Sequence, residues 1–477
     1  MPNLKSLDKT RAHAFLFKLM CIFLVLQPVF DVLSQLYVNE VIPIGISTYG
    51  KPLFVGFLNI ALVLVYRKHF WRCAIHYGLY LAFSVVHVLL IRGLLVEMFF
   101  ILPEIRHMLN LLYFLLCWHD VRILYEEAPD RDLFIRKLTK ALLACFGLYL
   151  VLYLLAVVTG TSGMTYAYAD DTKKGFRGWY HSGQIFGHAL SMCLPFLVTT
   201  MLNNKSKAPW LRIVCKLAVV VPVLVLCLIG TKVAFYIPVL VLSAQVILEL
   251  FFAIKDKQRC HLFNALICGV CVAACLVVYP ITPVYHNIGR NADALQREYS
   301  DEELAQFLAQ EREHHLSPGW KDREWTEAAL EVMEEKFLSR EVHPSEMRKR
   351  QFYFNTTKFD AAPLIYKVFG IGYINQNGMS IERDILCALL NFGIFGFLLI
   401  LLRPLLIWFR SVFWILRRLF KTDLTTLCLF EGLSMFFFIS FYAGYTFLFT
   451  QFSIFLTVIM CLLHHRIDKL ANDRLQS

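Results

Sequence analysis

The chain has 477 residues, of which 58% are hydrophobic and 17% are charged, with a mean hydropathy of +0.56. Soluble domains carry about a quarter charged residues, so this composition excludes an ordinary soluble protein and indicates an integral membrane protein. The net charge of +11 comes from basic residues that lie between apolar runs and form no single patch, which argues against a nucleic-acid partner.

The predicted fold class is all-α. A membrane-spanning helix needs about 20 mostly apolar residues, and by that measure the sequence predicts a polytopic bundle of about twelve transmembrane helices. The predicted spans are 14–33, 52–66, 73–91, 94–118, 138–159, 181–202, 213–229, 233–252, 262–281, 384–402, 424–442 and 445–464. The apolar stretch 213–252 is too long for one crossing, so we expect it to break at Gly230-Thr231-Lys232.

Basic residues test the order of these spans, because Lys and Arg gather in cytoplasmic loops. Every second connection is basic, and both terminal segments are basic too. The pattern predicts two cytoplasmic termini, an uncleaved first helix and an extracytoplasmic position for a long charged segment. The predicted organisation is transmembrane helices in 1–282, a large outer loop in 283–383, and transmembrane helices in 384–477.

The predicted outer loop has the patterning of a folded helical segment. Ser300 and Glu303 have the spacing of a capping box, and apolar residues follow them at helical intervals. A second amphipathic helix is predicted after Pro318, with Trp325 on its apolar face. Together with Trp320, the two helices either pack against the bundle or lie along the membrane surface or over the mouth of a cavity.

The motifs of nucleotide and metal chemistry are missing from the sequence. It contains no P-loop, no G-x-G-x-x-G and no G-x-S-x-G motif. Its 14 cysteines lie in apolar runs or in segments predicted to be cytoplasmic. Cys268, Cys271 and Cys275 share a face of one apolar helix and are interpreted as small buried hydrophobic residues in preference to metal ligands. We therefore expect neither a metal nor a cofactor.

The first candidate site is the segment 175–187, at an outer junction between a loop and a helix. Arg177 beside Gly178 can bring a guanidinium and backbone N–H groups to one phosphate, and the following helix start adds a partial positive charge. His181 lies in the same segment and is a candidate substrate-binding residue. The alternative is an arginine that reaches toward lipid headgroups.

Lys232 is the second candidate, because it lies in an outer hairpin so short that its side chain must be at the membrane boundary. An ionisable group at membrane depth is typical of a substrate site, and here it would be a phosphate ligand that faces a cavity. A nearby helix C-terminus or a lipid headgroup explains the residue equally well.

The long loop and the helix that follows it supply the remaining candidates. We expect one or two of Arg290, Arg348 and Arg350 to bind substrate and the other basic residues to be solvated. Glu382 and Asp384 precede the next apolar run, and either is a candidate general base at the membrane edge. The alternative is that these acids stabilise the helix start through its dipole. Four other charged residues in or beside apolar runs are interpreted as polar helix contacts in preference to a substrate path: Asp31, Glu97, Glu104 and Arg106.

Several short motifs follow one another along most of the chain. They are QPVFD at 27–31, Arg177-Gly178 with Gly187 and Pro195 after it, Gly230-Thr231-Lys232, a long loop containing arginine, FGIGY at 369–373, Glu382-x-Asp384 and NFGIFGF at 391–397. In their order and topology they resemble the O-antigen ligase/polymerase superfamily of bacterial membrane proteins, in particular its O-antigen-ligase-like branch.

The resemblance implies a GT-C-like glycosyltransferase in the bacterial cytoplasmic (inner) membrane. It implies transfer of a glycan from undecaprenyl pyrophosphate to an acceptor sugar on the outer side, without a metal, in making a capsule, exopolysaccharide, O-antigen or teichuronic acid type of polymer. Arg177, Lys232 and a loop arginine, with Arg348 as first choice, would hold the departing pyrophosphate, and Glu382 or Asp384 would activate the acceptor hydroxyl. The implied partners are the lipid-linked glycan, the acceptor glycan, membrane lipid, and flippase and chain-length regulator proteins.

Three features depart from the superfamily pattern. Ser182-Gly183-Gln184 stands where an asparagine is common after Arg-Gly, Lys232 stands where many members have arginine, and the histidine often seen before the final Gly-x-x-Gly is absent. Lysine cannot make the bidentate contact of arginine. These departures favour a polymerase over a lipid A ligase.

Two other function classes are kept as alternatives. A polysaccharide flippase or other transporter would show repeat symmetry and charges deep in several spans, and the sequence shows neither. A non-catalytic partner in a polysaccharide assembly complex would tolerate the loss of Arg177 and Lys232.

Overall fold

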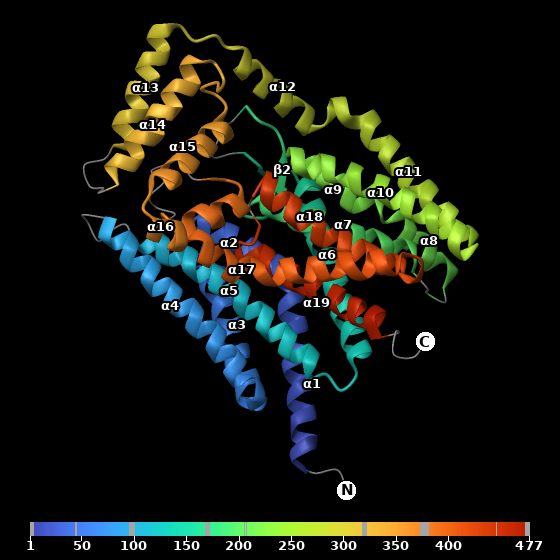
Figure 1. The fold of residues 1–477 in the computed structure, drawn as a ribbon. Helices are drawn as coiled ribbons and strands as arrows, with labels where there is room; N and C mark the ends of the chain where they lie inside the picture. Colours follow the sequence, from blue (N-terminus) through green and yellow to red (C-terminus); the bar gives the residue numbers. More distant parts are fainter. Residues whose placement is uncertain are drawn as a thin grey trace.

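The computed structural model describes residues 4–42, 45–94, 101–166, 172–204, 206, 208–316, 322–372, 381–444 and 446–472. Figure 1 shows one large bundle of helices, with the N-terminus at the bottom and the C-terminus at the right. A smaller helical unit stands at the top left of this view. We call the end of the bundle that carries this unit the loop side, and the opposite end, near both termini, the terminus side.

The first part of the chain forms helices that lead to a short hairpin. The helices are α1 (Leu4–Val25), α2 (Gln27–Val38), α3 (Ile46–Val65), η1 (Arg67–His69), α4 (Phe70–Leu94), α5 (Ile101–Glu126) and α6 (Arg131–Val158), and the strands are β1 (Gly163–Met164) and β2 (Phe176–Gly178). The middle part consists of α7 (Gly183–Leu202), α8 (Pro209–Leu217), α9 (Val220–Ile229), α10 (Lys232–Asp256), α11 (Arg259–Val278) and η3 (Tyr279–Ile281).

The rest of the chain builds the loop unit and returns to the bundle. The loop helices are α12 (Pro283–Gln296), α13 (Asp301–His315), α14 (Arg323–Leu338), α15 (Met347–Ala361) and α16 (Leu364–Phe369). The returning helices are α17 (Asp384–Arg417), η5 (Leu419–Lys421), α18 (Leu424–Tyr442) and α19 (Thr450–Asn472).

Eight helical segments in the described part of the chain are long and apolar enough to cross a membrane. They are Arg67–Gly93, Arg131–Val158, Gly183–Leu202, Pro209–Ile229, Lys232–Asp256, Arg259–Ile281, Asp384–Arg417 and Leu424–Tyr442. The pair α1 and α2, bent by 51°, forms a possible ninth. The predicted all-α membrane bundle is confirmed. The count of about twelve spans is not, because α3, α5 and α19 occupy predicted spans without meeting the same criterion of length and apolarity.

The position of α19 explains why it is less apolar than a lipid-facing span. Every residue from Phe452 to Leu463 is buried, and the helix packs against α5, α6, α7, α17 and α18. Ser453 and Thr457 satisfy their hydroxyls by donating to the main chain one turn earlier. A helix surrounded by protein tolerates such polar side chains, so hydropathy alone understates its depth in the bundle.

The predicted break at Gly230-Thr231-Lys232 is present. Gly230 has a left-handed φ of 82°, and Thr231 caps α10 by accepting a hydrogen bond from the N–H of Ala234 at 3.2 Å. A Cβ atom at residue 230 would lie 2.5 Å from the carbonyl oxygen of Lys174, so the close approach also requires glycine. The turn between α9 and α10 is therefore in contact with the hairpin.

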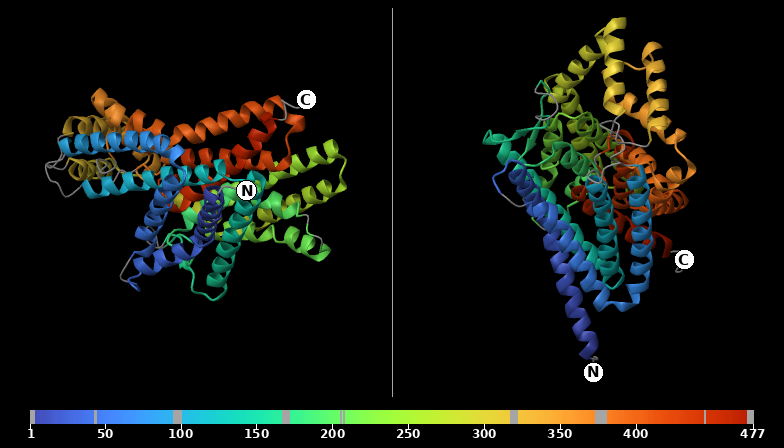
Figure 2. Two further views of the ribbon diagram at one scale, coloured as in Figure 1. Left: turned by 90° about the horizontal axis from the view of Figure 1, so that it is seen from below. Right: turned by 90° about the vertical axis from the view of Figure 1, so that its left-hand side faces the viewer.

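The loop unit has a small core of its own. Ser300 and Glu303 form the predicted capping box at the start of α13. Buried side chains of α14 and α15, among them Met333, Phe337 and Phe354, form a hydrophobic cluster separate from that of the bundle. The unit projects from one end of the bundle in Figure 1 and in the right-hand view of Figure 2.

The predicted aromatic face of the second loop helix is only partly visible. Pro318 and Trp320 lie outside the described residues, as does Glu97 in the bundle. Trp325 packs edge-on against Tyr366 of α16, with ring centroids 4.9 Å apart. This contact joins α14 to α16, so Trp325 packs against protein.

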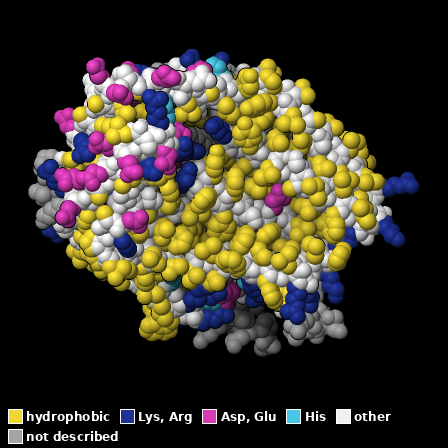
Figure 3. Space-filling model, turned by 45° about the horizontal axis from the view of Figure 1, so that its top comes forward, with side chains coloured by type: hydrophobic (Ala, Val, Ile, Leu, Met, Phe, Trp, Pro, Cys, Tyr) yellow, Lys and Arg dark blue, Asp and Glu magenta, His cyan; other side chains and the backbone are white. Residues whose placement is uncertain are grey.

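The surface carries a broad hydrophobic band. In Figure 3, hydrophobic side chains cover the middle of the face shown, while charged side chains gather at the upper left and along the right and lower edges. Large apolar residues are also exposed along α4 and α17, among them Trp71, Ile75, Phe409 and Phe413. Exposed apolar surface on this scale marks contact with lipid, so the chain is a multi-pass membrane protein.

Candidate functional site

Arg177 lies in the two-stranded hairpin that precedes α7. β1 and β2 pair antiparallel and place Gly163 opposite Gly178. The guanidinium lies against Gly163, where a Cβ atom would be 2.5 Å from Nε, and Nη1 donates to the carbonyl of His181 at 3.2 Å. Only 7% of Arg177 is exposed. The arginine therefore fixes the turn that leads into α7 and does not project freely toward solvent.

His181 is exposed but is surrounded by charged side chains. Loss of hydration and the positive charges of Arg177 and Arg106 lower the pKa of His181, and the carboxylate of Asp31 opposes this shift only in part. The imidazole is therefore neutral at physiological pH. It can donate or accept a hydrogen bond on the loop side.

Asn287 of α12 ties the hairpin to the turn before α10. Its Nδ2 donates to the carbonyl of Lys174 at 2.7 Å and to the carbonyl of Gly230 at 2.9 Å, and its Oδ1 accepts from the N–H of Lys174 at 2.8 Å. One buried side chain thus joins the segments that carry Arg177 and Lys232 to the first loop helix. No sequence motif pointed to Asn287, because an isolated Asn in a polar helix has no distinguishing local signal.

Arg348 of α15 and Glu382, which precedes α17, form an ion pair. Nε of Arg348 donates to Oε2 of Glu382 at 3.0 Å, and the two side chains are 41% and 32% exposed. The guanidinium also lies over the ring of Tyr442, 5.9 Å from its centroid. Among the described residues, the two terminal amino groups of Arg348 have no hydrogen-bond partner. They are available to an anion while Nε holds Glu382.

Tyr166 and Gln184 join this ion pair from the hairpin side. Tyr166 is hydrogen-bonded to Gln184 and lies within electrostatic reach of Arg348 and Glu382. Burial raises the pKa of Tyr166, against the opposing effects of Arg348 and Gln184, so its hydroxyl stays protonated. Gln184 lies in the first turn of α7. We call this group the loop-side cluster: Tyr166, Gln184, Arg348, Glu382 and Tyr442.

Lys232 lies on the same face of α10 as Tyr236. It is the first residue of the helix, is exposed, and has no ion-pair or hydrogen-bond partner among the described residues. Tyr236, one turn along the same face, lies within electrostatic reach of Tyr442. The dipole of α10 disfavours a cation at its N-terminus, so the stability of this helix does not account for Lys232.

Asp384 and Glu382 have different environments, although they are only two residues apart. Asp384 is 2% exposed, and its carboxylate accepts from the N–H and the hydroxyl of Thr446 at 2.5 and 2.7 Å. The main-chain carbonyl of Glu382 lies against Gly444, where there is no room for a side chain. Asp384 thus holds the connection between α18 and α19 against Glu382. Of the two predicted bases, Glu382 is the accessible one and Asp384 has a structural task.

Arg290 lies in a different place from Arg348. It lines a cavity of about 550 Å³ on the loop side, together with Lys174, His286 and Asp293, and neither Arg348 nor Glu382 is part of that lining. The loop arginines that the sequence could not rank are therefore separated by the fold.

The expectation that Arg350 is available to substrate is not met by its surroundings. Its Nη2 donates to Glu311 at 2.7 Å, its Nη1 donates to the carbonyl of Pro344 at 3.0 Å, and its guanidinium lies over Phe307. The residue is 8% exposed. Arg350 therefore holds α13 against α15 through the partly buried carboxylate of Glu311.

A buried His–Glu pair holds the end of α16 and was not predicted. His87 of α4 is hydrogen-bonded through Nδ1 to the carbonyl of Phe369 at 2.6 Å and through Nε2 to Glu104 at 2.7 Å. Because a carbonyl can only accept, Nδ1 carries a hydrogen. Both side chains are fully buried. The interpretation of Glu104 as a polar helix contact agrees with this geometry, and the only sequence signal for His87 was a lone histidine in an apolar span.

Asp31 also makes polar contacts between helices. Its carboxylate pairs with Lys51 at 2.8 Å and accepts a hydrogen bond from the hydroxyl of Tyr149. Lys51 and Asp31 are both buried, so the loss of either residue would leave a buried charge without its partner. The network lies within the bundle and joins α2, α3 and α6.

The chemistry available in this region is that of a carboxylate, guanidinium groups, a phenol and an amide. Within the described ranges, no group of three or more His, Cys, Asp or Glu residues could hold a metal ion. Glu382 binds one side of the Arg348 guanidinium, and the two terminal amino groups of Arg348 can bind an anion. This arrangement suits proton transfer to the carboxylate while negative charge develops nearby.

One family model matches nearly the whole chain. Residues 13–470 match the family described as O-antigen ligase like membrane protein. No curated protein matches the sequence. The family match spans the bundle, the loop unit and the loop-side cluster together, and it supports a membrane glycan ligase or polymerase. The chain belongs to the O-antigen ligase like membrane protein family.

Proposed function

We propose that the chain transfers a glycan from undecaprenyl pyrophosphate to an acceptor sugar on the outer side of the bacterial cytoplasmic membrane. Family membership supports the ligase or polymerase class. In this proposal both termini are cytoplasmic, in keeping with the basic connections near them. The segment 283–383 is then the extracytoplasmic loop between the membrane helices of 1–282 and 384–477.

The observation that carries the proposal is the ion pair of Arg348 and Glu382. As the acceptor hydroxyl oxygen forms its bond to the anomeric carbon of the donor sugar, Glu382 takes the hydroxyl proton. The bond from the anomeric carbon to the pyrophosphate oxygen breaks, and its electron pair leaves with undecaprenyl pyrophosphate. The two terminal amino groups of Arg348 stabilise the charge that develops on the leaving group.

Lys232 and Arg177 complete the proposed anion site in different ways. Lys232 is exposed at the start of α10 and supplies a second cation to the departing pyrophosphate. Arg177 acts indirectly, because it holds the carbonyl of His181 and because its charge, together with the larger effect of lost hydration, lowers the pKa of that imidazole. His181 then donates a hydrogen bond to substrate. Arg290 is proposed to contact a more distant part of the glycan, from the cavity that it lines.

The proposed product is a surface polysaccharide of the capsule, exopolysaccharide, O-antigen or teichuronic acid type. Polymerase activity is favoured over lipid A ligation by Ser182-Gly183-Gln184 and by Lys232, where the chain departs from the superfamily pattern. A flippase would deliver the donor and a chain-length regulator would act on the product. We propose that both are partners in the cell.

The test is complementation of a deletion strain, with polymer length and the pool of lipid-linked repeat units measured together. The strains carry the wild type, Glu382→Gln, Arg348→Gln, Arg177→Ala or the control Arg297→Ala. Arg297 forms an exposed ion pair with Glu303 on the loop unit, with side chains 61% and 47% exposed, so its loss changes charge without touching the loop-side cluster.

The outcomes separate the function classes. We expect Glu382→Gln and Arg348→Gln to abolish polymer while single repeat units accumulate on the outer leaflet, and Arg297→Ala to resemble the wild type. Accumulation on the inner leaflet would instead identify a flippase. Normal polymer in every variant, at wild-type protein levels, would remove these residues from the chemistry and would favour a non-catalytic partner.

A further inference from the structure

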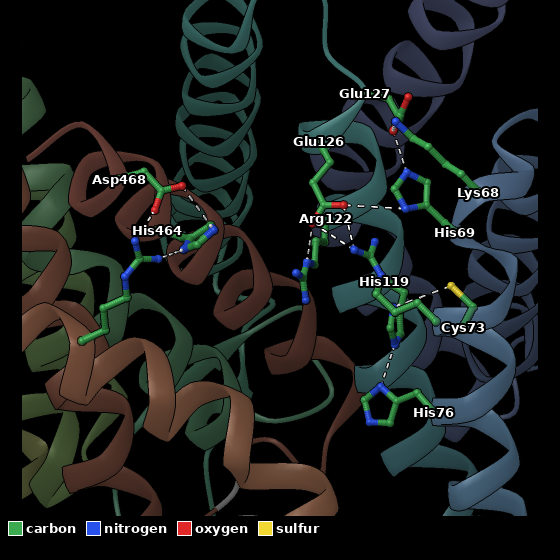
Figure 4. A network of polar contacts seen from close by, with 12 residues as sticks. Lys68, His69, Cys73, His76, His119, Arg122, Glu126, Glu127, His464 and Asp468 are labelled. Carbon is green, nitrogen blue, oxygen red and sulfur yellow. Dashed lines mark hydrogen bonds and ion pairs between the residues drawn. The ribbon is translucent and has the colours of Figure 1, made fainter. Parts of the chain in front are cut away.

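A group of basic residues lies on the terminus side, where α4, α5 and α17 meet. We call it the basic cluster: Arg72, His76, His119, Arg122 and Arg403. His76 and His119 are joined through Nδ1 and Nε2 at 2.7 Å, and Figure 4 shows them below Arg122 and Glu126. Arg403 of α17 lies within electrostatic reach of both histidines. The cluster is at the opposite end of the bundle from the loop-side cluster.

Positive charge exceeds negative charge in the basic cluster. Nη1 of Arg72 donates to both carboxylate oxygens of Glu126, at 3.1 and 2.8 Å, and Nε of Arg122 donates to the same carboxylate at 2.6 Å. Arg403 lies within electrostatic reach of Arg72 and Arg122, and has no acidic or hydrogen-bonding partner among the described residues. Glu127 is paired with Lys68 instead. Arg72 and Arg122 therefore share one carboxylate, and Arg403 adds a third positive charge beside them.

Arg72 also has donors that the protein leaves unused. Its Nε and Nη2 atoms are buried, and in the described part of the chain neither has a hydrogen-bond partner. A buried donor without a partner destabilises a fold. These two atoms have no surface that a ligand can reach, whereas Arg403 is exposed, and a guanidinium is suited to bind a phosphate through two parallel bonds.

The helices α4 and α17 are in contact beside the cluster. They touch where Gly396 lies against Phe83, since a Cβ atom at residue 396 would be 2.5 Å from that ring. His76 and Arg403 each lie about two helical turns from this contact, toward the terminus side, and thus on the same helix faces. His76 and Arg403 therefore face one another across the interface of α4 and α17.

Exposed apolar side chains continue from the cluster along both helices. Ile75 and Leu79 are exposed on α4, and Leu402 and Leu406 on α17. Only 22% of the most apolar stretch of the Arg67–Gly93 span is buried, so α4 is covered mainly by lipid. A ligand that fits both features has an anionic head and apolar chains.

We propose that the basic cluster binds the phosphate headgroup of an anionic phospholipid whose acyl chains lie along α4 and α17. Free phosphate shares the headgroup chemistry, but it would leave the neighbouring apolar faces unused. Basic pockets between membrane helices are suited to such headgroups, and each cation near the membrane surface strengthens binding. This inference does not depend on the proposed transferase activity.

The test uses the purified full chain in zwitterionic detergent micelles. Its thermal unfolding temperature is measured after addition of phosphatidylglycerol, phosphatidylcholine or inorganic phosphate, and retained lipid is counted by native mass spectrometry. Arg403→Gln is the informative variant because Arg403 has no partner to lose in the described structure. The matched control is Arg466→Gln on the same side, which removes an arginine paired with Asp423 at 3.3 Å.

We expect phosphatidylglycerol to stabilise and remain bound to the wild type and to Arg466→Gln. Arg403→Gln should bind it about fivefold more weakly, since one cation near the surface is lost. Phosphatidylglycerol binding to Arg403→Gln at wild-type strength would overturn the proposal, as would equal retention of phosphatidylcholine. Equal stabilisation by inorganic phosphate alone would replace the lipid site with a site for a free anion.

Discussion

Nε of Arg348 lies 3.0 Å from Oε2 of Glu382, although Arg348 belongs to α15 and Glu382 precedes α17. The contact joins the loop unit to the start of α17 at the edge of the membrane bundle. Because both side chains remain partly exposed, the pair is reachable by a large substrate. The predictions below separate this pair from the residues that only hold it in place.

Loss of the Glu382 carboxylate should affect activity far more than stability. Glu382→Gln keeps the size of the side chain but removes the proton acceptor, so we expect glycan transfer to fall by roughly 10²- to 10⁴-fold. Partly exposed ion pairs contribute about 0–1 kcal/mol, so the unfolding temperature should hardly change. The assay is transfer by the purified protein from a lipid-linked repeat unit. Full activity of Glu382→Gln would remove Glu382 from the chemistry.

Asn287→Ala should damage the arrangement of the hairpin. The substitution leaves the carbonyl groups of Lys174 and Gly230 without their buried partner, at a cost of about 1–3 kcal/mol for each unsatisfied group. We expect a lower unfolding temperature and reduced polymer formation. Asn291→Ala, one turn along α12, is the control and should behave as the wild type. Equal behaviour of the two variants would show that Asn287 does not hold these segments together.

The loop unit depends on a buried ion pair between Lys358 and Asp322, 2.6 Å apart and almost fully enclosed. Lys358→Ala leaves the Asp322 carboxylate buried without its cation, so we expect local destabilisation of about 3–5 kcal/mol. Hydrogen exchange of the backbone amides in α14 and α15 measures this local destabilisation. Lys336→Ala removes an exposed pair with Glu341 and serves as the control. The prediction is wrong if the amides of α14 and α15 exchange at the same rate in both variants.

The stability of the loop unit should fall in acid. Burial alone would raise the pKa of Glu311, but the hydrogen bond to His315 and the charge of Arg350 outweigh it and lower that pKa below its ordinary value of 4.5. A carboxyl whose pKa is lowered by folding contributes stability above that ordinary value, and the contribution is lost as the pH falls further. We expect faster proteolysis of the wild-type loop near pH 4 than near pH 6.

Two variants check this origin of the acid sensitivity. Glu311→Gln cannot titrate, so its proteolysis rate should depend less on pH between these values. Glu313 lies on the same helix and is exposed, so Glu313→Gln should keep the wild-type dependence. An unchanged pH profile in Glu311→Gln would assign the effect to another group.

Membrane topology can be tested with two single-cysteine proteins. Ser339→Cys in an otherwise cysteine-free chain places a thiol on the exposed end of α14, and native Cys260 is exposed near the start of α11. With the proposed topology, an impermeant thiol reagent labels residue 339 in intact cells and labels Cys260 only after the membrane is opened. Labelling of Cys260 in intact cells, and of residue 339 only after the membrane is opened, would show that the topology is the inverse of the proposed one.

The sequence by itself determined the class of the protein and much of its local structure. Apolar runs predicted the helical membrane bundle because a helix satisfies its own backbone groups in lipid. Ser300 and Glu303 predicted the start of α13, and Gly230 predicted the break before α10, since capping and positive φ depend on residues a few positions apart. Motif order also pointed to the family that the chain belongs to.

Tertiary structure decided which of the candidate residues meet. Arg348 and Arg350 look equivalent in sequence, but two residues along a helix turn a side chain to nearly the opposite face. Arg348 therefore reaches Glu382, whereas Arg350 is enclosed with Glu311. The contact of Asn287 with the hairpin is equally invisible in the chain. Hydropathy and capping are local properties, while pairing between distant segments depends on how the whole bundle packs.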